Sequence, residues 1–237
     1  MSDSTVSRTA EEGGQWGWKP APSPARLTLT GSLVTLRPID LNTDSRPLFE
    51  SSHDGRDPHL WEYLFHGPFP SEAEFRRYLT GLAASTDDIF FTVVERSTSR
   101  PSGICSYLRM VPAHGVIEIG HIWFVPALQR TPQATEAIYL LARHVFDDLG
   151  YRRLEWKCDA RNVRSRRAAE RFGFHFEGIF RQHMVVKGRN RDTAWFGMTD
   201  GDWAAVKQAF EEWLRPENFD SSGRQRRSLE AIRAALI

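Results

Sequence analysis

The loop Gln129–Ala134 and the start of the helix after it have the residue types of a phosphate-binding site. Thr131 is a suitable N-cap, and Pro132 is a suitable first helical residue because its missing N–H has no partner within a helix. Three backbone amides would point out of the helix N-terminus: those of Gln133, Ala134 and Thr135. Arg130 and the positive end of the helix dipole add favourable charge. The pattern indicates a site for a phosphate or pyrophosphate, although Thr131 and Pro132 could also mark no more than a helix start.

Alternating strands and helices must position this loop. The residue pattern predicts a strand over Val116–Val125 before the loop and a helix over Thr135–Leu149 after it. A strand over Arg153–Asp159 and a helix over Asn162–Phe172, with Asn162 as its cap, follow. A strand, helix, strand and helix in this order imply a parallel pair within the sheet.

The other periodic segments predict the rest of the sheet and its helical cover. Ile89–Glu95 and Gly103–Val111 precede Val116–Val125 with short connections, which is typical of an antiparallel meander. The remaining predicted elements are a strand over Ser32–Arg37, a helix capped by Ser71 with Glu74 and buried through Phe75, Tyr78, Leu79 and Leu82, strands over Phe176–Val186 and Thr193–Met198, and a helix over Trp203–Leu214. We therefore expect an α+β fold of three layers: a mixed, mostly antiparallel twisted sheet with a central parallel pair, flanked by helices.

The composition describes a folded domain and offers no signature of a metal site or a membrane span. The 237 residues include 31 Lys and Arg against 30 Asp and Glu, which gives a net charge of +1 and argues against a polybasic nucleic-acid binder. Cys105 and Cys158 cannot supply a disulfide framework, and the eight histidines show no metal-binding spacing, so no metal is expected. No secretory pattern and no run of about 18 apolar residues is present, so we expect a cytoplasmic protein.

The chain divides into three predicted parts. Residues 1–30 are rich in Ser, Thr, Gly and Pro and are expected to form a mobile arm, although Trp16 and Trp18 predict that part of it docks. Residues 31–214 form the main domain, and residues 215–237 a linker and a terminal helix. That helix carries three apolar residues on one side, Leu229, Ile232 and Leu236. They should dock on the domain or on a second subunit, so a homodimer is possible.

Four separated pieces of the chain resemble motifs A and B of the GNAT superfamily of acyl-CoA N-acyltransferases. They are the strand IGHIWFVP, the ATEA at the head of the helix, Asn162 with Ser165 three residues on, and the phrase RFGFHFEG. Within the superfamily the branch of ribosomal-protein alanine N-acetyltransferases is the most similar. The resemblance covers about residues 31–200, and its specificity comes from four pieces in the right order.

The resemblance implies acetyl-CoA as co-substrate and a primary amine as acceptor. The residues at the family's cofactor-binding positions are Ile122, Phe124, Gln129, Arg130, Thr131, Gln133, Ala134, Thr135, Asn162 and Ser165. One position departs from the family pattern, because Pro132 stands where the middle glycine of the loop is usual. Proline lacks an amide donor and cannot adopt positive φ, so we expect Arg130 and the Thr131 hydroxyl to compensate.

Amine acylation by a thioester needs a base, because an amine is cationic near neutral pH. Glu118 matches the strand position where many family members place a carboxylate, and His121 has an ordinary pKa suited to the task. Strict alternation puts the two on opposite faces unless a bulge intervenes, so Glu118, His121 and a water molecule all remain candidates.

Two further groups complete the predicted reaction centre. Backbone N–H groups around Ile122–Val125 are candidates to hold the oxyanion, and Ser165 is the candidate to protonate the leaving thiolate. The tyrosine that family members often carry on this helix is missing. Each residue could also have a purely structural role, since Glu118 could simply pair with a cation, His121 could be a buried rim histidine, and Asn162 could be only a cap.

The segment 151–193 carries twelve Lys and Arg against five Asp and Glu, a local charge of +7. Arg164, Arg167 and Arg171 would share one helix face, which admits a nucleic-acid partner. The phosphates of CoA account for the same charge, so we expect no nucleic-acid partner. Two further functions stay open for this sequence: transfer of a different acyl group such as succinyl, and a CoA- or RNA-binding module without turnover.

Overall fold

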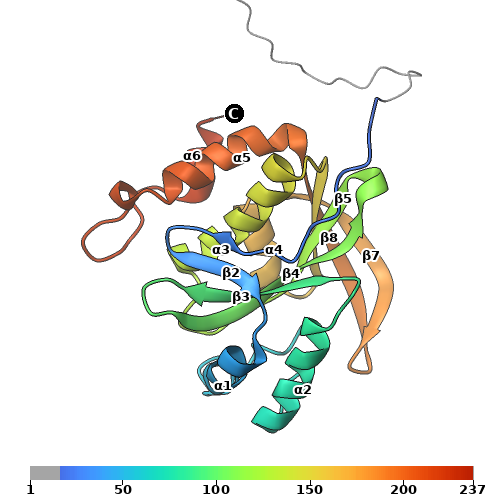
Figure 1. Cartoon of the computed structure of the whole chain (residues 1–237). Helices are drawn as coiled ribbons and strands as arrows, with labels where there is room; N and C mark the ends of the chain where they lie inside the picture. The colour runs from blue at the N-terminus through green and yellow to red at the C-terminus, as the bar shows by residue number, and fades with distance from the viewer. Residues whose placement is uncertain (1–16, 237) are drawn as a thin grey trace, which may run out of the picture.

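The computed structural model describes residues 17–236 as one eight-stranded sheet with helices on both faces (Figure 1). The strands lie in the order β1-β2-β3-β4-β5-β6-β8-β7. Their bounds are Leu29–Thr30 (β1), Val34–Pro38 (β2), Ile89–Glu95 (β3), Arg100–Val111 (β4), Val116–Phe124 (β5), Arg153–Asp159 (β6), His175–Val186 (β7) and Arg189–Thr199 (β8). All neighbours are antiparallel except β5 and β6, which are parallel. The predicted mixed sheet with a central parallel pair is confirmed.

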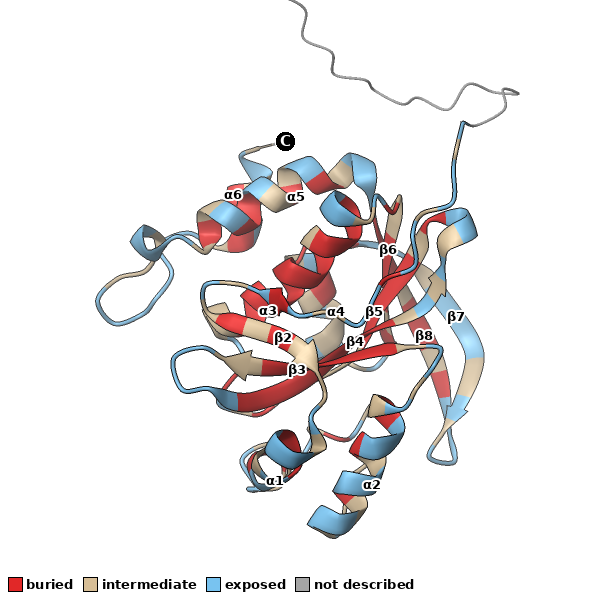
Figure 2. Cartoon of the chain, viewed as in Figure 1, coloured by how far each residue is buried: buried red, intermediate tan, exposed pale blue. Residues whose placement is uncertain are grey.

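The helices divide between the two faces of the sheet. Helices α1 (Leu41–Ser52) and α2 (Glu72–Ala83) cover one face, and α3 (Pro132–Arg143) with α4 (Val163–Arg171) lies on the other (Figure 1). Helix α5 (Asp200–Trp213) packs on α3. Figure 2 shows that buried residues concentrate in the central strands of the sheet and in α3, which packs on one face of it.

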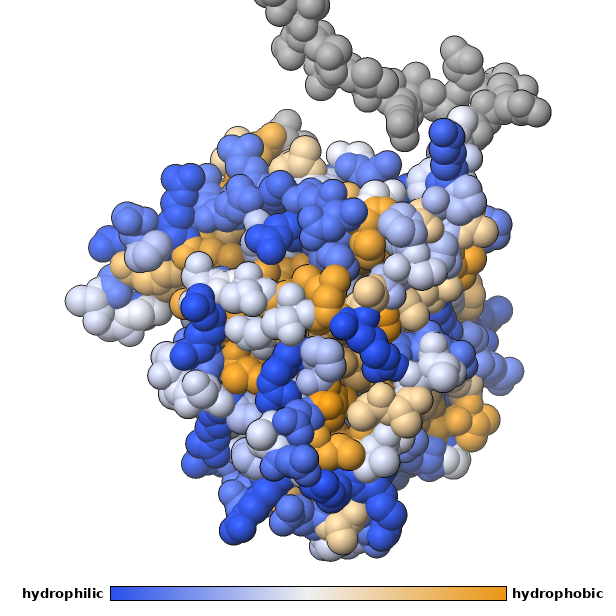
Figure 3. Space-filling view, in the orientation of Figure 1, coloured by the Kyte–Doolittle hydropathy of each residue, from blue (hydrophilic) through white to orange (hydrophobic). Residues whose placement is uncertain are grey.

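The outer surface is largely polar. Hydrophilic residues cover most of the face drawn in Figure 3, and apolar residues lie between them in smaller patches. No helix within residues 17–236 is both long enough and apolar enough to cross a bilayer.

Two predicted helix ends differ from the observed ones. The helix predicted over Thr135–Leu149 already starts at Pro132, the first helical residue that the loop pattern indicated. It continues past Arg143 as a π-helical turn, His144–Asp148, and Gly150 then takes a positive φ of 65°. At α2, Ser71 accepts the amide of Glu74 as expected. The Glu74 carboxylate pairs with Arg77 instead of returning to the cap, so the predicted capping box is only half formed.

The sequence analysis missed helix α1. Its segment is polar and contains Pro47, which are both weak signals for a helix. Asp40 caps it, and the buried carboxylate of Asp44 pairs with Arg37 of β2 and accepts a hydrogen bond from Thr92 of β3. Polar contacts with the sheet therefore help to hold this helix, together with the buried side chain of Leu48.

Part of the predicted mobile arm is packed on the domain. Trp18 Nε1 donates to the carbonyl of Ala113 at 2.8 Å, and the Ala21 amide donates to the carbonyl of Pro112 at 3.0 Å. Residues 29–30 form β1 beside β2. The arm prediction is therefore wrong for residues 17–30, while the predicted docking of Trp18 is confirmed; Trp16 lies outside the described residues.

The C-terminal segment folds back onto the domain. The predicted terminal helix is the shorter α6 (Leu229–Ala234), which packs on α5 with Leu229 and Ile232 buried. Arg233 donates to the carbonyls of Arg171 and Glu170, which ties α6 to the end of α4. Of the two docking surfaces expected for this helix, it therefore uses its own domain.

Candidate active site

Strands β5 and β6 lie side by side only at their beginnings. Val116–Glu118 pairs with Arg153–Glu155, and the pairing found among the described residues stops there although both strands continue. Beyond this point the facing edges of β5 and β6 are therefore not joined by a ladder. Helices α3 and α4 both begin shortly after these separated strand ends.

The start of α3 is built as predicted, but its amides are used differently. Thr131 is the N-cap, and its Oγ1 accepts the amide of Ala134 at 3.2 Å. The amide of Thr135 donates to the Thr131 carbonyl, also at 3.2 Å. Two of the three amides predicted to face a phosphate are thus engaged within the helix, which leaves the amide of Gln133 as the remaining candidate.

The Thr131 hydroxyl does not compensate for Pro132. It donates its hydrogen to the carbonyl of Leu128 at 2.6 Å, so it has none for a phosphate. Arg130, in contrast, is exposed and has a φ of 62°, the left-handed conformation that Pro132 cannot adopt. Within this loop the positive φ lies at Arg130, two residues before Pro132, and the Arg130 side chain is at the surface beside the helix start.

Asp57 joins the start of α3 to the start of α4, and the sequence analysis did not find it. Its Oδ2 accepts hydrogen bonds from Gln129 Nε2 at 3.2 Å and from Arg164 Nη1 at 3.0 Å. Gln129 also donates to the carbonyl of Phe124 at the end of β5. A lone aspartate in a loop gives no sequence signal for this role, because its partners lie 72 and 107 residues away.

Helix α4 places Ser165 close to β6. Asn162 accepts the Ser165 amide at 3.0 Å, which confirms it as the cap. Ser165 Oγ accepts the indole N–H of Trp156 at 2.9 Å. The Ser165 hydroxyl also forms a hydrogen bond with the Cys158 thiol, and it lies on the α3 and α4 side of the sheet.

The arginines of α4 do not form one exposed face. Arg164 pairs with Asp57, whereas Arg171 turns inward, donates to Thr135 Oγ1 at 3.1 Å and lies 4.8 Å from the ring centroid of Trp213. Arg167 is exposed. The common face predicted for these three arginines is therefore wrong.

A β-bulge in β5 decides where Glu118 and His121 point. Gly120 lies opposite Ser106 and Trp123 opposite Ile104, so two residues of β5, His121 and Ile122, face one residue of β4. His121 has a φ of 48°. The bulge brings His121 to the α1 and α2 face of the sheet. Glu118 lies on the same face, because its partner on β4, Leu108, lines the same pocket as His121.

The bulge also affects the predicted oxyanion donors. Ile122 and Phe124 are half-buried, on the part of β5 that does not pair with β6. The amide of Val125 donates to the carbonyl of Ser102 at 2.9 Å, so it is not available. The candidate donors are therefore confined to the bulge and the residues next to it.

His121 is held at Nε2 by Tyr78. Its Nε2 lies 2.5 Å from the Tyr78 hydroxyl, whose oxygen also accepts the indole N–H of Trp123 at 3.2 Å. We assign the neutral imidazole the tautomer that carries hydrogen on Nε2 and donates it to the Tyr78 oxygen, which leaves the lone pair of Nδ1 free to accept a proton. Burial, with a smaller effect of His66, lowers the pKa of His121 to about 4. The expectation of an ordinary pKa is therefore wrong, and His121 is uncharged at neutral pH.

Glu118 lies between two cations. Its carboxylate is 2.9 Å from Arg109 Nε and 3.0 Å from Lys157 Nζ, and its side chain is 4% exposed. Burial raises the pKa of this carboxyl, while Lys157 and Arg109 act in the opposite direction. Lys157 also pairs with Glu155 at 2.7 Å. This geometry agrees with the structural alternative given for Glu118, in which the carboxylate pairs with neighbouring cations.

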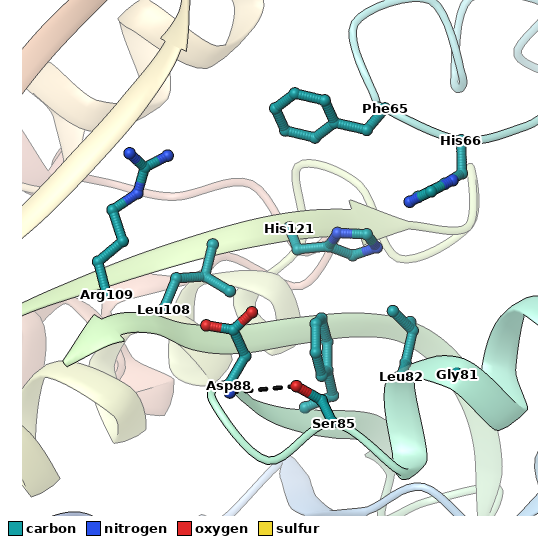
Figure 4. A pocket seen from close by; sticks show the side chains of 10 residues that line it. Phe65, His66, Gly81, Leu82, Ser85, Asp88, Leu108, Arg109 and His121 are labelled. Carbon is teal, nitrogen blue, oxygen red and sulfur yellow. Dashed lines mark hydrogen bonds between the residues drawn. The ribbon is translucent and has the colours of Figure 1, made fainter.

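A pocket of about 360 Å³ lies against His121 on this face (Figure 4). Phe65 and His66 come from the loop after α1, and Asp88 and Arg109 come from the strand side. The Asp88 amide donates to Ser85 Oγ, and its carboxylate points into the pocket in Figure 4. The pocket thus holds an imidazole, a carboxylate and a guanidinium within one space.

Among the described residues, no group of three or more His, Cys, Asp or Glu side chains is arranged to hold a metal ion.

Residues 34–175 match the acetyltransferase (GNAT) domain family. The chain is 48% identical to a GCN5-related N-acetyltransferase from Brucella melitensis, with a TM-score of 0.90 over 92% of this chain and 99% of that one. A GNAT-family acetyltransferase from Chromobacterium violaceum is 44% identical, with a TM-score of 0.75 over 83% of this chain and 98% of that one. The uncharacterized N-acetyltransferase p20 of Bacillus licheniformis is 25% identical over 75% of this chain and 98% of its own length.

Two more distant structures share the fold alone. One, described as a ribosomal-protein-serine acetyltransferase from Vibrio cholerae, is 21% identical with a TM-score of 0.64 over 73% of this chain and 97% of that one. The other is the microcin C7 self-immunity acetyltransferase MccE, solved with acetyl-CoA and AMP, at 17% identity and a TM-score of 0.60 over 71% of this chain and 93% of that one. The family match over residues 34–175, together with the separated parallel strands and the two helix starts beside them, leads to one conclusion: the chain is a GNAT acetyltransferase.

Proposed function

We propose that the protein is an acetyl-CoA-dependent N-acetyltransferase that acetylates a primary amine by direct transfer in a ternary complex. The observation that carries the proposal is the separation of β5 from β6 with the N-termini of α3 and α4 beside it, in a chain of the GNAT family. The acceptor is a protein N-terminus or a small-molecule amine, and the ribosomal-protein branch remains part of the proposal. Cys105 and Cys158 are both free and buried, which suits a reducing, cytoplasmic compartment.

Acetyl-CoA would bind along the unpaired edge of β5 and across the start of α3. The backbone of Ile122 and Phe124 would hold the pantetheine chain, and the Gln133 amide with Arg130 would meet the pyrophosphate. Gln129 and Asn162 would position these groups through the contacts described above. MccE, which was solved with acetyl-CoA, shares this fold and supports the assignment of the co-substrate.

We propose that His121, directly or through a water molecule, accepts the proton from the amine. The amine nitrogen then attacks the thioester carbonyl, the C–N bond forms, and the C–S bond breaks. His121 lines the pocket and is uncharged at neutral pH, which are two requirements for a base. Oε2 of Glu118 already faces both Arg109 and Lys157, so Glu118 is better suited to holding these cations than to taking up a proton.

The leaving thiolate needs a hydrogen bond or a proton. Ser165 could supply it by turning its hydroxyl hydrogen from the Cys158 thiol toward the leaving sulfur, while its oxygen still accepts from Trp156. The two faces of the sheet would then have different tasks, with the amine on the α1 and α2 side and the thiol toward α4.

The co-substrate proposal is tested by thermal denaturation with acetyl-CoA, CoA and succinyl-CoA. A ligand that binds only the folded state raises its stability by about 2.7 kcal/mol at one hundred times Kd. We expect acetyl-CoA and CoA to raise Tm. With acetyl-CoA and a panel of amines, we expect the enzyme to release free CoA. The absence of any shift would contradict the proposal, and a larger shift with succinyl-CoA would change the acyl group.

The base is tested by His121→Gln and Tyr78→Phe. We expect His121→Gln to lower kcat by at least 100-fold and leave acetyl-CoA affinity unchanged, because general-base catalysis contributes about 10²–10⁴-fold. Tyr78→Phe keeps the ring but removes the hydroxyl beside Nε2, so a smaller loss is expected. Full activity of His121→Gln would assign the proton to water or to Glu118.

A further inference from the structure

Arg191 of β8 is a buried guanidinium without a matching carboxylate. The residue is 6% exposed, and its Nε has no hydrogen-bond partner among the described residues. The guanidinium carbon lies 5.2 Å from the ring centroid of Phe65. Burial lowers the pKa of Arg191, which reflects the cost of holding this charge away from water. A buried charge in this state is costly unless something pairs with it.

The neighbouring carboxylates already have other partners. Asp159, the nearest to influence Arg191, accepts hydrogen bonds from Arg161 Nε at 3.1 Å and Nη2 at 2.8 Å. Next to it, three cations are matched with three anions: Arg109, Lys157 and Arg153 with Glu118, Glu155 and Glu177. Arg191 takes part in none of these ion pairs, so its positive charge has no carboxylate as a partner among the described residues.

A second buried donor lies on the same strand. The indole N–H of Trp195, four residues from Arg191 on β8, is buried and has no hydrogen-bond partner within residues 17–236. Alternate residues of a strand face the same side, so Arg191 and Trp195 lie on one face of the sheet. Lys157 Nζ, which pairs with Glu118, lies 3.7 Å from the ring centroid of Trp195. Both unpartnered donors therefore belong to the face that carries Glu118 and His121.

Phe65 lies between Arg191 and the candidate reaction pocket. Its ring contacts the Arg191 guanidinium, and the same side chain lines the pocket with His121 and Arg109 (Figure 4). Arg191 itself is not one of the lining residues. An acceptor whose amine reaches His121 would therefore contact Phe65 before its other end reached Arg191.

We infer that the acceptor of this acetyltransferase is an amine that also carries a carboxylate, and that Arg191 binds this carboxylate beside the reaction centre. The inference rests on the proposed function and names its substrate class. A guanidinium matches a carboxylate through two parallel N–H donors, which suits a group with a free Nε. The ligand would supply the missing counter-charge. The same carboxylate could belong to a free amino acid or to an acidic side chain near a peptide N-terminus.

Matched acceptors that differ only in this charge test the inference. One pair is alanine and alaninamide, and the other is two peptide amides that begin with Asp or with Asn. After correction for the fraction of free amine, we expect the carboxylate member of one pair to have at least a tenfold higher kcat/KM. The pair that discriminates identifies the source. Equal kcat/KM values within both pairs would overturn the inference.

Arg191→Gln should reduce that preference to within twofold and leave the KM for acetyl-CoA unchanged. Arg189→Gln is the matched control, because Arg189 is exposed on the same strand. The Tm of Arg191→Gln should equal or exceed that of the wild type, since an unpaired buried charge is removed. A preference that survives in Arg191→Gln, or a fall in Tm of several degrees, would show that Arg191 has a structural role instead.

A binding measurement keeps the inference separate from turnover. N-acetylalanine, or the acetylated Asp peptide, should raise the Tm of the wild type and not that of Arg191→Gln. The matching amide should raise neither. Failure of this shift while acetyl-CoA still raises Tm would overturn the inference alone, whereas loss of the acetyl-CoA shift would overturn the proposed function.

Discussion

Glu118 and His121 lie three residues apart on one strand, yet their surroundings give them different chemistry. Two cations hold the carboxylate of Glu118, while the Tyr78 hydroxyl holds the imidazole of His121 at Nε2. A group that is neutral and lines a pocket can exchange a proton, whereas a doubly paired carboxylate mainly holds its cations in place. The two residues should therefore respond differently to substitution.

Glu118→Gln should mainly lower stability. The substitution leaves Arg109 without its carboxylate and Lys157 with Glu155 alone, which should cost on the order of 2 kcal/mol in the free energy of unfolding. Denaturant unfolding measures the loss. Glu177→Gln is the control, because its carboxylate is 41% exposed and should cost less than about 1 kcal/mol. An unchanged stability with a kcat lowered by orders of magnitude would instead make Glu118 the base.

His121 should make stability depend on pH. Its pKa is about 4 in the folded chain and about 6.5 when unfolded, so between these values the unfolded chain binds the extra proton. Stability should therefore fall as the pH is lowered from 6.5 toward 4. The fall should be smaller in His121→Gln, which can be measured by urea unfolding at several pH values. Identical slopes in both proteins would contradict the lowered pKa.

At the scale of elements, the proposed acetyl-CoA site depends on the relative positions of two helix starts. Asp57 is the link, because it accepts from Gln129 before α3 and from Arg164 on α4. Neither helix contains this residue; the loop between α1 and α2 supplies it.

Asp57→Ala should weaken acetyl-CoA binding about tenfold, which corresponds to about 1.4 kcal/mol. The expected cause is the release of Gln129 and Arg164, and titration of CoA binding measures it. Asp54→Ala is the matched control, since Asp54 lies in the same loop and pairs only with the nearby Arg56. Equal affinities of the two variants would show that Asp57 does not position the site.

At the scale of the whole molecule, the net charge of +1 conceals a basic segment. The +7 over residues 151–193 is partly neutralised by internal pairs, including Arg161 with Asp159 and Arg164 with Asp57. Arg171 is turned into the domain. These contacts reduce the positive charge that is available to a nucleic-acid partner.

We therefore expect no association with RNA or duplex DNA at about 0.15 M salt. Phosphate contacts weaken steeply with salt, so any binding at low salt should disappear as the concentration rises. CoA should also compete for it. Fluorescence anisotropy over a salt series measures both effects. Binding that persists at physiological salt and resists CoA would contradict this expectation.

The sequence alone determined the order and type of most elements. The antiparallel meander over β3–β5, the parallel pair of β5 and β6, and the caps Ser71, Thr131 and Asn162 all rest on local signals. Periodicity and capping depend on residues within a few positions of each other, so a linear pattern carries them. Helix α1 was missed because its supports, Arg37 and Thr92, lie in other elements.

Only the tertiary structure decided which side chains meet. The bulge at His121 brought this residue to the face of Glu118. The bulge is visible in the pairing of β5 with β4, and the residue types of β5 do not reveal it. Tyr78, Asp57 and Arg191 joined the site from segments far apart in the chain. The charge state of His121 likewise depends on burial, which no local pattern reveals. Local interactions therefore made the fold predictable, whereas the chemistry of the site depends on long-range contacts.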